Sequence, residues 1–201
     1  MYYSLFDTAL GTCGIIFRSV DDGRIVHILL PASEKDILTR IKKLHPESIE
    51  ENSPKIQRLV DAIVRYLNGE NIQLPMDLLD TSVCYPFQLN VLMAEHTIPR
   101  GMVASYGWVA RQIGTKGVRA VGNALARNPF PLVIPCHRAV RSDRTLGGFQ
   151  GGLEMKRALL EMEGVEFDAK FRVASEFMMT AESTRKTVDT NQYVGSSIWL
   201  I

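Results

Sequence analysis

The stretch RAVGNALARNPFPLVIPCHRAV, residues 119–140, joins a helical pattern to a cysteine and a histidine that follow an apolar run. The cysteine, Cys136, is one of only three in a chain of 201 residues. It could be inert core filling, a metal ligand, half of a disulfide or a nucleophile. A reactive cysteine is a thiolate whose pKa is lowered by a nearby base or cation, and His137 and Arg138 follow Cys136 directly. The surrounding sequence has to decide among these roles.

The residues before this stretch predict a helix-turn-helix. Ser105 is a suitable N-cap for a helix over YGWVARQI, residues 106–113, and Gly114 is a suitable stop. A second helix is predicted from Val118 towards Asn128. Two helices joined by a short turn that contains glycine are typical of DNA-binding helix-turn-helix units, although many helical hairpins share this outline.

The second of these helices is rich in small residues. Arg119 and Asn123 are its main polar residues, and its small residues are Ala120, Gly122, Ala124 and Ala126. A helix that reads the major groove needs long hydrogen-bonding side chains, whereas a slim helix can enter the minor groove, which is about 6 Å wide and carries a degenerate code. Alternatively, the small residues pack inside the domain. Both interpretations can hold on different faces of the helix.

The segment between this helix and the cysteine is predicted to turn sharply. Asn128 and the prolines after it end the helix, and the apolar residues 132–134 (LVI) are predicted to form a buried strand. Pro135 cannot extend a central strand, so Cys136 is expected at a sharp exit from the core.

The first half of the chain has a different pattern. Residues 2–8, 13–18 and 24–30 are short β-rich runs separated by turn signals, which predict an antiparallel meander. Apolar residues then recur at helical spacing from Ser33 and again after Pro54, which predicts two helices.

A connector with two prolines is expected over residues 71–87, and a further helix from Pro86 to before Pro99. The fold class is therefore α/β, with a small antiparallel-sheet-plus-helix domain followed by a mostly helical, winged helix-turn-helix-like domain. The expected divisions are residues 1–80, residues 81–170, and a tail of unknown role over residues 171–201, which could be disordered or pack as a strand.

Composition and charge narrow the class of protein. Hydrophobic residues make up 46% of the chain, which is enough to bury one large core or two small ones. The net charge is only +1, but between Arg100 and Thr145 there are eight basic residues and a single acid, Asp143. This asymmetry predicts one domain that meets a polyanion, unless the basic residues only form a solvated face.

The cysteines indicate a reducing compartment. Cys13, Cys84 and Cys136 are odd in number, far apart and in no CxxC pairing, so neither a disulfide framework nor a zinc ribbon is indicated. No signal peptide pattern occurs, and no apolar run approaches the ~20 residues that a membrane span needs. We therefore expect a soluble, cytoplasmic protein that does not associate with membranes.

The stretch IPCHRAV, residues 134–140, together with residues 119–133 and LGGFQGGLEMKRALLEMEG, residues 146–164, closely resembles the active-site region of the O6-alkylguanine-DNA alkyltransferases. This family is also called methylated-DNA–protein-cysteine methyltransferase. The resemblance extends from about Pro86 to Gly164 and implies that Cys136 accepts an alkyl group from O6 of guanine, irreversibly and once per molecule.

The resemblance also implies roles for other residues. His137 would act as a base through a water, with Glu163 polarising it, although Glu163 alone would read as an exposed surface acid. Tyr106 would donate a proton towards guanine N3 as the base leaves. Arg119 would enter the duplex and fill the gap left by the extruded nucleotide, because O6 cannot be reached inside paired DNA. Asn128 would connect the DNA-binding helix to the active-site segment.

The resemblance also implies residues of the base-binding pocket and of the DNA-binding surface. Pro131 and Phe149 would contact the flipped base, and the backbone carbonyl of Ala139 would accept a hydrogen bond from guanine. Gln150 stands where many relatives carry a small residue, which changes the expected pocket size. The residues expected at the minor groove are Arg119, Ala120, Gly122, Asn123 and Asn128.

The expected partner is double-stranded DNA that contains O6-alkylguanine, bound by a monomer without a cofactor. Some relatives bind zinc through two cysteines and two histidines, but the candidates here do not align to that pattern, so no required metal is predicted; these candidates are Cys13, Cys84, His27, His45 and His96. Two alternatives remain. An alkyltransferase-like lesion-binding protein would lack the acceptor cysteine, and a cysteine hydrolase would have no need for a minor-groove helix.

Overall fold

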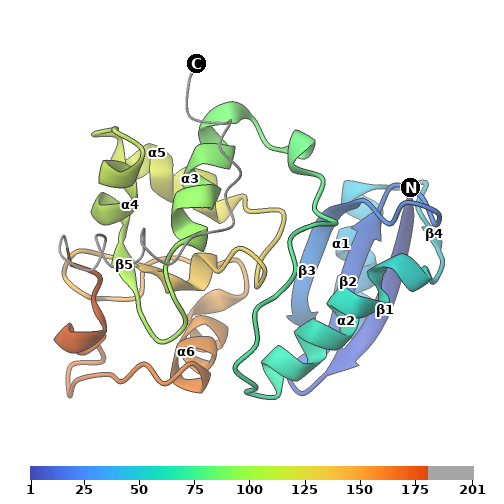
Figure 1. The fold of residues 1–201 in the computed structure, drawn as a ribbon. Coiled ribbons are helices and arrows are strands. Elements are labelled where there is room, and N and C mark those ends of the chain that lie inside the picture. Colours follow the sequence, from blue (N-terminus) through green and yellow to red (C-terminus); the bar gives the residue numbers. More distant parts are fainter. Residues whose placement is uncertain (181–201) are drawn as a thin grey trace.

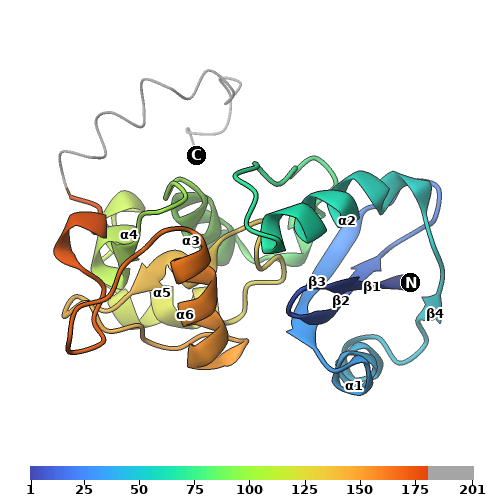
Figure 2. The same ribbon diagram turned by 90° about the horizontal axis from the view of Figure 1, so that it is seen from below.

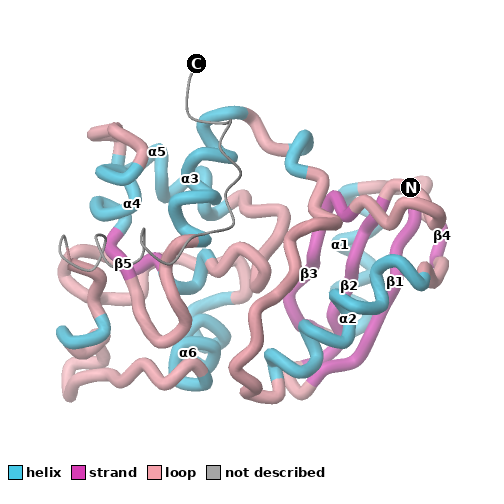
Figure 3. Tube along the Cα trace, in the orientation of Figure 1, coloured by secondary structure: helices cyan, strands magenta, loops and turns pink. Residues whose placement is uncertain are grey.

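Strands gather in the first half of the chain, and helices and loops make up most of the second half (Figure 3). The computed structural model describes residues 1–180, and residues 181–201 lie outside that description. Figure 1 shows the two halves side by side, joined by the long connector that follows helix α2.

The first half is built on a four-stranded sheet in the order β3-β2-β1-β4. Its strands are β1 (Tyr2–Thr8), β2 (Gly11–Phe17), β3 (Ile25–Ala32) and β4 (Ile49–Glu50). The first three strands form the predicted antiparallel meander. The sequence did not predict β4, which is two exposed residues long and lies parallel to β1. A strand this short carries no readable alternation of apolar and polar residues.

Helices α1 (Glu34–Leu44) and α2 (Pro54–Leu67) cover opposite faces of this sheet (Figure 2). Both begin where the sequence predicted, because each start has a local signal. The hydroxyl of Ser33 accepts a hydrogen bond from the backbone N–H of Asp36, and Ser53 caps α2 ahead of a proline that suits its first turn. The apolar cluster under α2 continues into the second half of the protein, so one core joins the two halves.

The second half contains the predicted helix-turn-helix. Its helices are α3 (Pro86–His96), α4 (Tyr106–Gln112), α5 (Val118–Ala126) and α6 (Gly152–Met162). The Ser105 hydroxyl accepts a hydrogen bond from the backbone N–H of Trp108, as an N-cap does, and Gly114 ends the first helix with a φ of 67°. The helix-turn-helix outline is therefore present in α4 and α5.

A short parallel pair of strands brings the start of α4 to the segment after the cysteine. Strand β5 (Ala104–Ser105) pairs with β6 (Ala139–Val140), with Ala104 opposite Ala139 and Ser105 opposite Val140. As a result, the residue that opens α4 lies beside the segment that contains the Cys-His pair.

The prediction of a buried strand at residues 132–134 is wrong. These residues are buried, but they form a turn in which the N–H of Ile134 donates to the carbonyl of Phe130 at 2.9 Å, and Leu132 has a φ of 72°. The side chain of Asn128 holds this turn through hydrogen bonds to both of its ends, at 2.8 and 2.9 Å. Prolines at both ends of the apolar run remove backbone donors that a strand would need.

Residues 171–180, in the segment expected to be a tail, pack on the second half. The backbone of Val103 accepts a hydrogen bond from Met179 and donates one to Phe177, at 2.7 and 2.8 Å, and Val173 is fully buried. This part includes the 3₁₀ helix η3 (Ser175–Phe177). The rest of the expected tail, residues 181–201, lies outside the described residues. Within residues 1–180, no helix has the length and apolar character needed to cross a membrane.

Candidate active site

Cys136 lies at the wall of a cavity of about 450 Å³. It opens the 3₁₀ helix η2 (Cys136–Arg138), directly after the turn that Asn128 holds, and only 5% of its surface is exposed. The cavity is lined by Tyr106, Gly122, Leu125, Ala126, Cys136, Arg141, Gly147, Gly148, Phe149 and Gln150. A volume of this size suits a small organic molecule or a nucleobase.

The resting thiol of Cys136 is uncharged. Burial raises the pKa of Cys136 to about 11, although a hydrogen bond from Asn128 and the positive charge of Lys156 act in the opposite direction. Arg138, the cation nearest to Cys136 in the sequence, does not lower the pKa of this thiol, because its guanidinium group pairs with Glu163. Reaction at Cys136 therefore requires removal of a proton.

His137 is a buried imidazole that lies against Glu163. It is fully buried, and its Nε2 lies 3.1 Å from Oε1 of Glu163. Burial lowers the pKa of His137 in spite of the opposing effect of Glu163, so the imidazole is neutral near pH 7. Because the carboxylate accepts a hydrogen bond from Nε2, the basic nitrogen is Nδ1. Among residues 1–180, this Nδ1 atom has no hydrogen-bond partner.

Glu163 is the centre of a buried hydrogen-bond network. Its side chain is fully buried at the end of α6, which contradicts the simple interpretation of an exposed surface acid. Arg138 donates three hydrogen bonds to its carboxylate, Nη2 to Oε1 at 2.6 Å, Nε to Oε2 at 2.9 Å and Nε to Oε1 at 3.2 Å, and Tyr66 donates one at 2.5 Å. Burial alone would raise the pKa of Glu163, but His137 and Arg138 together lower it well below its usual range. The carboxylate is therefore charged at any physiological pH.

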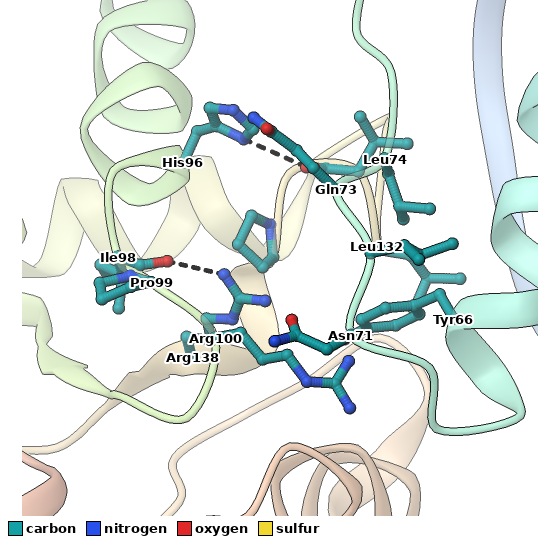
Figure 4. Close-up of a pocket in the computed structure, with 13 residues that line it drawn as sticks. Tyr66, Asn71, Gln73, Leu74, His96, Ile98, Pro99, Arg100, Leu132 and Arg138 are labelled. Atoms are coloured by element: carbon teal, nitrogen blue, oxygen red, sulfur yellow. Dashed lines mark hydrogen bonds between the residues drawn. The ribbon is translucent and has the colours of Figure 1, made fainter. Parts of the chain in front are cut away.

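Tyr66 is a site residue that the sequence did not predict. It belongs to α2, in the first half of the protein, and lines a second cavity of about 230 Å³ where the halves meet (Figure 4). Arg138 reaches the same place from the other half, and its Nη1 donates to the carbonyl of Ile98 at 2.6 Å (Figure 4). The apolar spacing of α2 indicates that position 66 is buried, but the partner of its hydroxyl cannot be read from the sequence.

Tyr106, the first residue of α4, faces the cavity that contains Cys136. Burial raises the pKa of Tyr106, so its hydroxyl stays protonated and can donate a hydrogen bond. Gly147 packs against it: a Cβ atom at position 147 would lie 2.7 Å from the Tyr106 hydroxyl oxygen. The ring of Phe149 lies edge-on to His137, with ring centroids 6.3 Å apart.

The remaining predicted pocket residues divide into two groups. Phe149 and Gln150 line the cavity, and Gln150 donates a hydrogen bond to the carbonyl of Asn128 at 2.9 Å. Pro131 and Ala139 are buried nearby but are not part of the lining. The Ala139 carbonyl accepts a hydrogen bond from Nζ of Lys156 at 2.5 Å.

Lys156 is a second residue that the sequence analysis missed. Its ammonium group is fully buried and also donates to the carbonyls of Leu146 and Gly148, at 2.6 and 3.3 Å. It therefore fastens the loop that borders the cavity to the segment after Cys136. Lys156 shares one face of α6 with Leu159, Leu160 and Glu163, and this helical spacing is the signal that could have indicated its burial.

Helix α5 presents its small residues on two faces. Arg119, Ala120 and Asn123 are exposed and Gly122 is half-buried, whereas Ala124 packs in the core. The packing interpretation is therefore confirmed for Ala124, while the minor-groove interpretation of the exposed face stays a prediction. Five of the eight basic residues between positions 100 and 144 are exposed, namely Arg111, Lys116, Arg119, Arg127 and Arg141.

No group of three or more His, Cys, Asp or Glu side chains within residues 1–180 could hold a metal ion. His27 and His45 approach each other, with ring centroids 5.5 Å apart. The three cysteines are unpaired in the described part of the chain.

Comparison with known proteins agrees with this geometry. Residues 86–165 match the family model described as 6-O-methylguanine DNA methyltransferase, DNA binding domain. The methylated-DNA–protein-cysteine methyltransferase of Haemophilus influenzae is 35% identical over 171 residues, which cover 83% of this chain and 88% of that protein. The methylated-DNA–protein-cysteine methyltransferase of Methanothermobacter thermautotrophicus is 45% identical over 115 residues, which cover 57% of this chain and 65% of that protein.

Solved structures show the same fold. The crystal structure of Mycobacterium tuberculosis OGT in complex with DNA has a TM-score of 0.66 and 29% identity, and the match covers 81% of this chain and 92% of that chain. O6-methylguanine-DNA methyltransferase from Pyrococcus kodakaraensis has a TM-score of 0.65 and 28% identity, over 81% of this chain and 99% of that one. The chain spans less of the bifunctional Ada protein of Escherichia coli, 45% of its length at 35% identity. With 88% of the Haemophilus protein matched at 35% identity, the chain belongs to the methylated-DNA–protein-cysteine methyltransferases, the O6-alkylguanine-DNA alkyltransferase family, whose members repair DNA by transferring an alkyl group to a cysteine of their own.

Proposed function

We propose that this protein repairs O6-alkylguanine in DNA by moving the alkyl group to Sγ of Cys136, once per molecule. The observation that carries this proposal is the position of Cys136 in the wall of a cavity large enough for a nucleobase, next in sequence to a buried neutral histidine whose Nε2 is held by Glu163.

The proposed reaction is an in-line displacement at the alkyl carbon. The bond from Sγ to carbon forms while the bond from carbon to O6 of guanine breaks. The thiol proton passes through a water to Nδ1 of His137, and the charged carboxylate of Glu163 stabilises the imidazolium that forms. Tyr106 donates a proton towards guanine N3, so the base leaves as neutral guanine. The product thioether is a very poor leaving group, which makes the transfer irreversible.

Access to O6 requires the nucleotide to leave the duplex. The exposed small-residue face of α5 suits the minor groove, and Arg119 projects from that face to fill the space left in the stack. The ordered turn that Asn128 holds connects this helix to Cys136. Phe149 and Gln150 would then lie against the flipped base.

The test is a single-turnover reaction with an oligonucleotide that contains O6-methylguanine. We expect one methyl group removed per protein molecule, a mass increase of one methyl group on the peptide that contains Cys136, and no transfer by Cys136→Ser. Methylation of Cys13 or Cys84 instead, or repeated turnover, would overturn the proposal. Turnover of a thioester or peptide substrate would favour the cysteine hydrolase alternative, and lesion binding without transfer would favour the alkyltransferase-like alternative.

A further inference from the structure

Glu95 is a buried carboxyl group without a hydrogen bond. The buried face of α3 consists of Gln88, Val91, Leu92 and Glu95, at the spacing of one helix face. Gln88 donates hydrogen bonds to the carbonyls of Ala124 and Arg127. Glu95 is fully buried, and neither of its carboxyl oxygens has a partner among residues 1–180. Buried polar groups are nearly always hydrogen-bonded, so this exception needs a functional or structural reason.

Both reacting and charged groups of the site lie within electrostatic range of Glu95. Four groups interact electrostatically with its carboxyl group. They are Cys136 and Arg138 of η2, Lys156 of α6 and Tyr106 of α4. Arg138 is already paired with Glu163. Lys156 is therefore the cation that Glu95 shares with the thiol.

An ionised Glu95 would compete with the thiolate of Cys136. A carboxylate without hydrogen bonds in a buried site is costly, and burial raises the pKa of Glu95 to about 8 even though Lys156 and Arg138 oppose the change. Near pH 7 the group is therefore neutral, and Lys156 stabilises a single anion, the thiolate. Above that range Glu95 becomes charged, and its charge raises the pKa of the thiol.

Lys156 is held as a charged ammonium group, the form that can stabilise either the thiolate of Cys136 or the carboxylate of Glu95. Its Nζ donates to three carbonyls, those of Ala139, Leu146 and Gly148, and only the charged ammonium group has three N–H bonds. Burial lowers the pKa of Lys156 to about 8, while the charges of Cys136 and Glu95 act against that change. The three groups therefore titrate as a coupled set.

We propose that Glu95 is a positioning residue of the transfer reaction, and that its carboxyl group has to be uncharged for Lys156 to stabilise the thiolate of Cys136. This inference rests on the proposed function, because it concerns the activation of the same thiol. It assigns a role to a buried acid that neither touches the substrate nor belongs to the network of Glu163.

The test compares wild type with Glu95→Gln, which mimics the neutral carboxyl group. Alkylation of Cys136 by iodoacetamide is followed by mass spectrometry of its peptide between about pH 6.5 and about pH 8.5, and repair of O6-methylguanine is measured in parallel. A change of one unit in the thiol pKa alters the thiolate fraction about tenfold. We expect equal rates at the acid end, where Glu95 is neutral, and at least about threefold faster alkylation of the variant at the alkaline end.

Controls separate charge from structure. Glu95→Met should follow Glu95→Gln, because both lack the charge, and Glu161→Gln, which removes an exposed acid of α6, should follow wild type. Parallel pH profiles for wild type and Glu95→Gln, or slower alkylation of that variant at every pH with an unchanged Tm, would overturn the proposal. The iodoacetamide profiles do not depend on repair. Divergent profiles in a protein that does not repair O6-methylguanine would therefore refute the proposed function and leave the role of Glu95 in thiol acidity intact.

Discussion

The hydroxyl group of Tyr66 donates a hydrogen bond of 2.5 Å to Glu163, although 97 positions separate the two residues. Tyr66 lies on α2 in the first half of the protein, and Glu163 caps α6 in the second. The same hydroxyl oxygen lies 3.3 Å from Nε2 of His137. The first half of the protein therefore takes part in fixing the orientation of the proposed base.

Tyr66→Phe removes this contact while keeping the ring in the core. A hydrogen bond to a charged group contributes about 1.5–3 kcal/mol, so we expect the free energy of unfolding to fall by about that amount and repair to slow. Urea unfolding and single-turnover repair would measure the two effects. Tyr85→Phe is the control, because Tyr85 is exposed. A repair rate equal to that of wild type would show that Glu163 does not need this donor to hold His137.

Gly147→Ala should disturb Tyr106. The added Cβ would lie 2.7 Å from the Tyr106 hydroxyl oxygen, and the φ of 68° at position 147 disfavours any residue with a side chain. We expect slower repair, because the tyrosine would be displaced from the cavity. Gly148→Ala is a matched control one residue away, where a Cβ meets no atom within 4 Å. Equal repair by both variants would argue against a role for the position of Tyr106.

The elements that the sequence predicted are those with local signals. Helices α2, α3 and α4 begin at Pro54, Pro86 and directly after Ser105, because a proline or a capping serine fixes a helix start within a few residues. Strand β4 and the turn over residues 130–134 were not predicted. Their geometry depends on pairing with β1 and on the side chain of Asn128 rather than on their own composition.

The same distinction applies to the candidate site. Cys136 and His137 lie in a short motif that resembles a known family, so they could be named from the sequence. Tyr66, Glu95 and Lys156 each occupy a polar position on an apolar helix face, which predicts burial but not a partner. Their partners are distant in sequence, and only the packing of α2, α3 and α6 around the Cys-His segment brings them together.

Histidine protonation should destabilise the protein in acid. The pKa values of all four histidines, His27, His45, His96 and His137, are lowered, first of all by burial. The unfolded chain binds protons at a pKa of about 6.5 while the folded protein resists them, so stability is lost as the pH falls through that value. Glu95 acts in the opposite direction, because its raised pKa adds stability as the pH falls from about 8.

The pair formed by His27 and His45 isolates this effect, because it lies outside the active site. We expect the free energy of unfolding of wild type to decrease from about pH 7 to about pH 5.5 more steeply than that of His27→Asn/His45→Asn. Urea titrations at several pH values would measure both slopes. Identical slopes would show that these two imidazoles titrate alike in the folded and unfolded states.

Arg119→Ala should affect repair of duplex DNA more than reaction with a free base. If Arg119 fills the gap left by a flipped nucleotide, its loss slows extrusion, which costs a few kcal/mol, but free O6-benzylguanine has no stack to leave. Single-turnover rates with both substrates would measure the difference, and Arg40→Ala, at an exposed cation of α1 in the first half of the protein, is the control. Equal losses on the two substrates would mean that Arg119 supports the fold or the pocket instead.

The charge distribution predicts how strongly salt weakens DNA binding. Of the eight basic residues between positions 100 and 144, three already have internal partners: Arg138 pairs with Glu163, Arg144 with Asp168, and Arg100 donates to backbone carbonyls. The exposed remainder could neutralise at most a few phosphates, and each contributes about −0.9 to the slope of log affinity against log salt. We therefore expect a slope of a few units, well short of that of a strongly basic protein.

Fluorescence-anisotropy titrations over a salt series, on two unmodified duplexes of unrelated sequence, would measure both this slope and the sequence preference. Because the exposed face of α5 carries mainly small residues, contacts to bases should be few and the two duplexes should bind almost equally. Strong preference for one duplex would indicate major-groove reading by α5. A flat salt response would exclude the exposed cations from the interface, and with them the proposed approach of this helix to the minor groove.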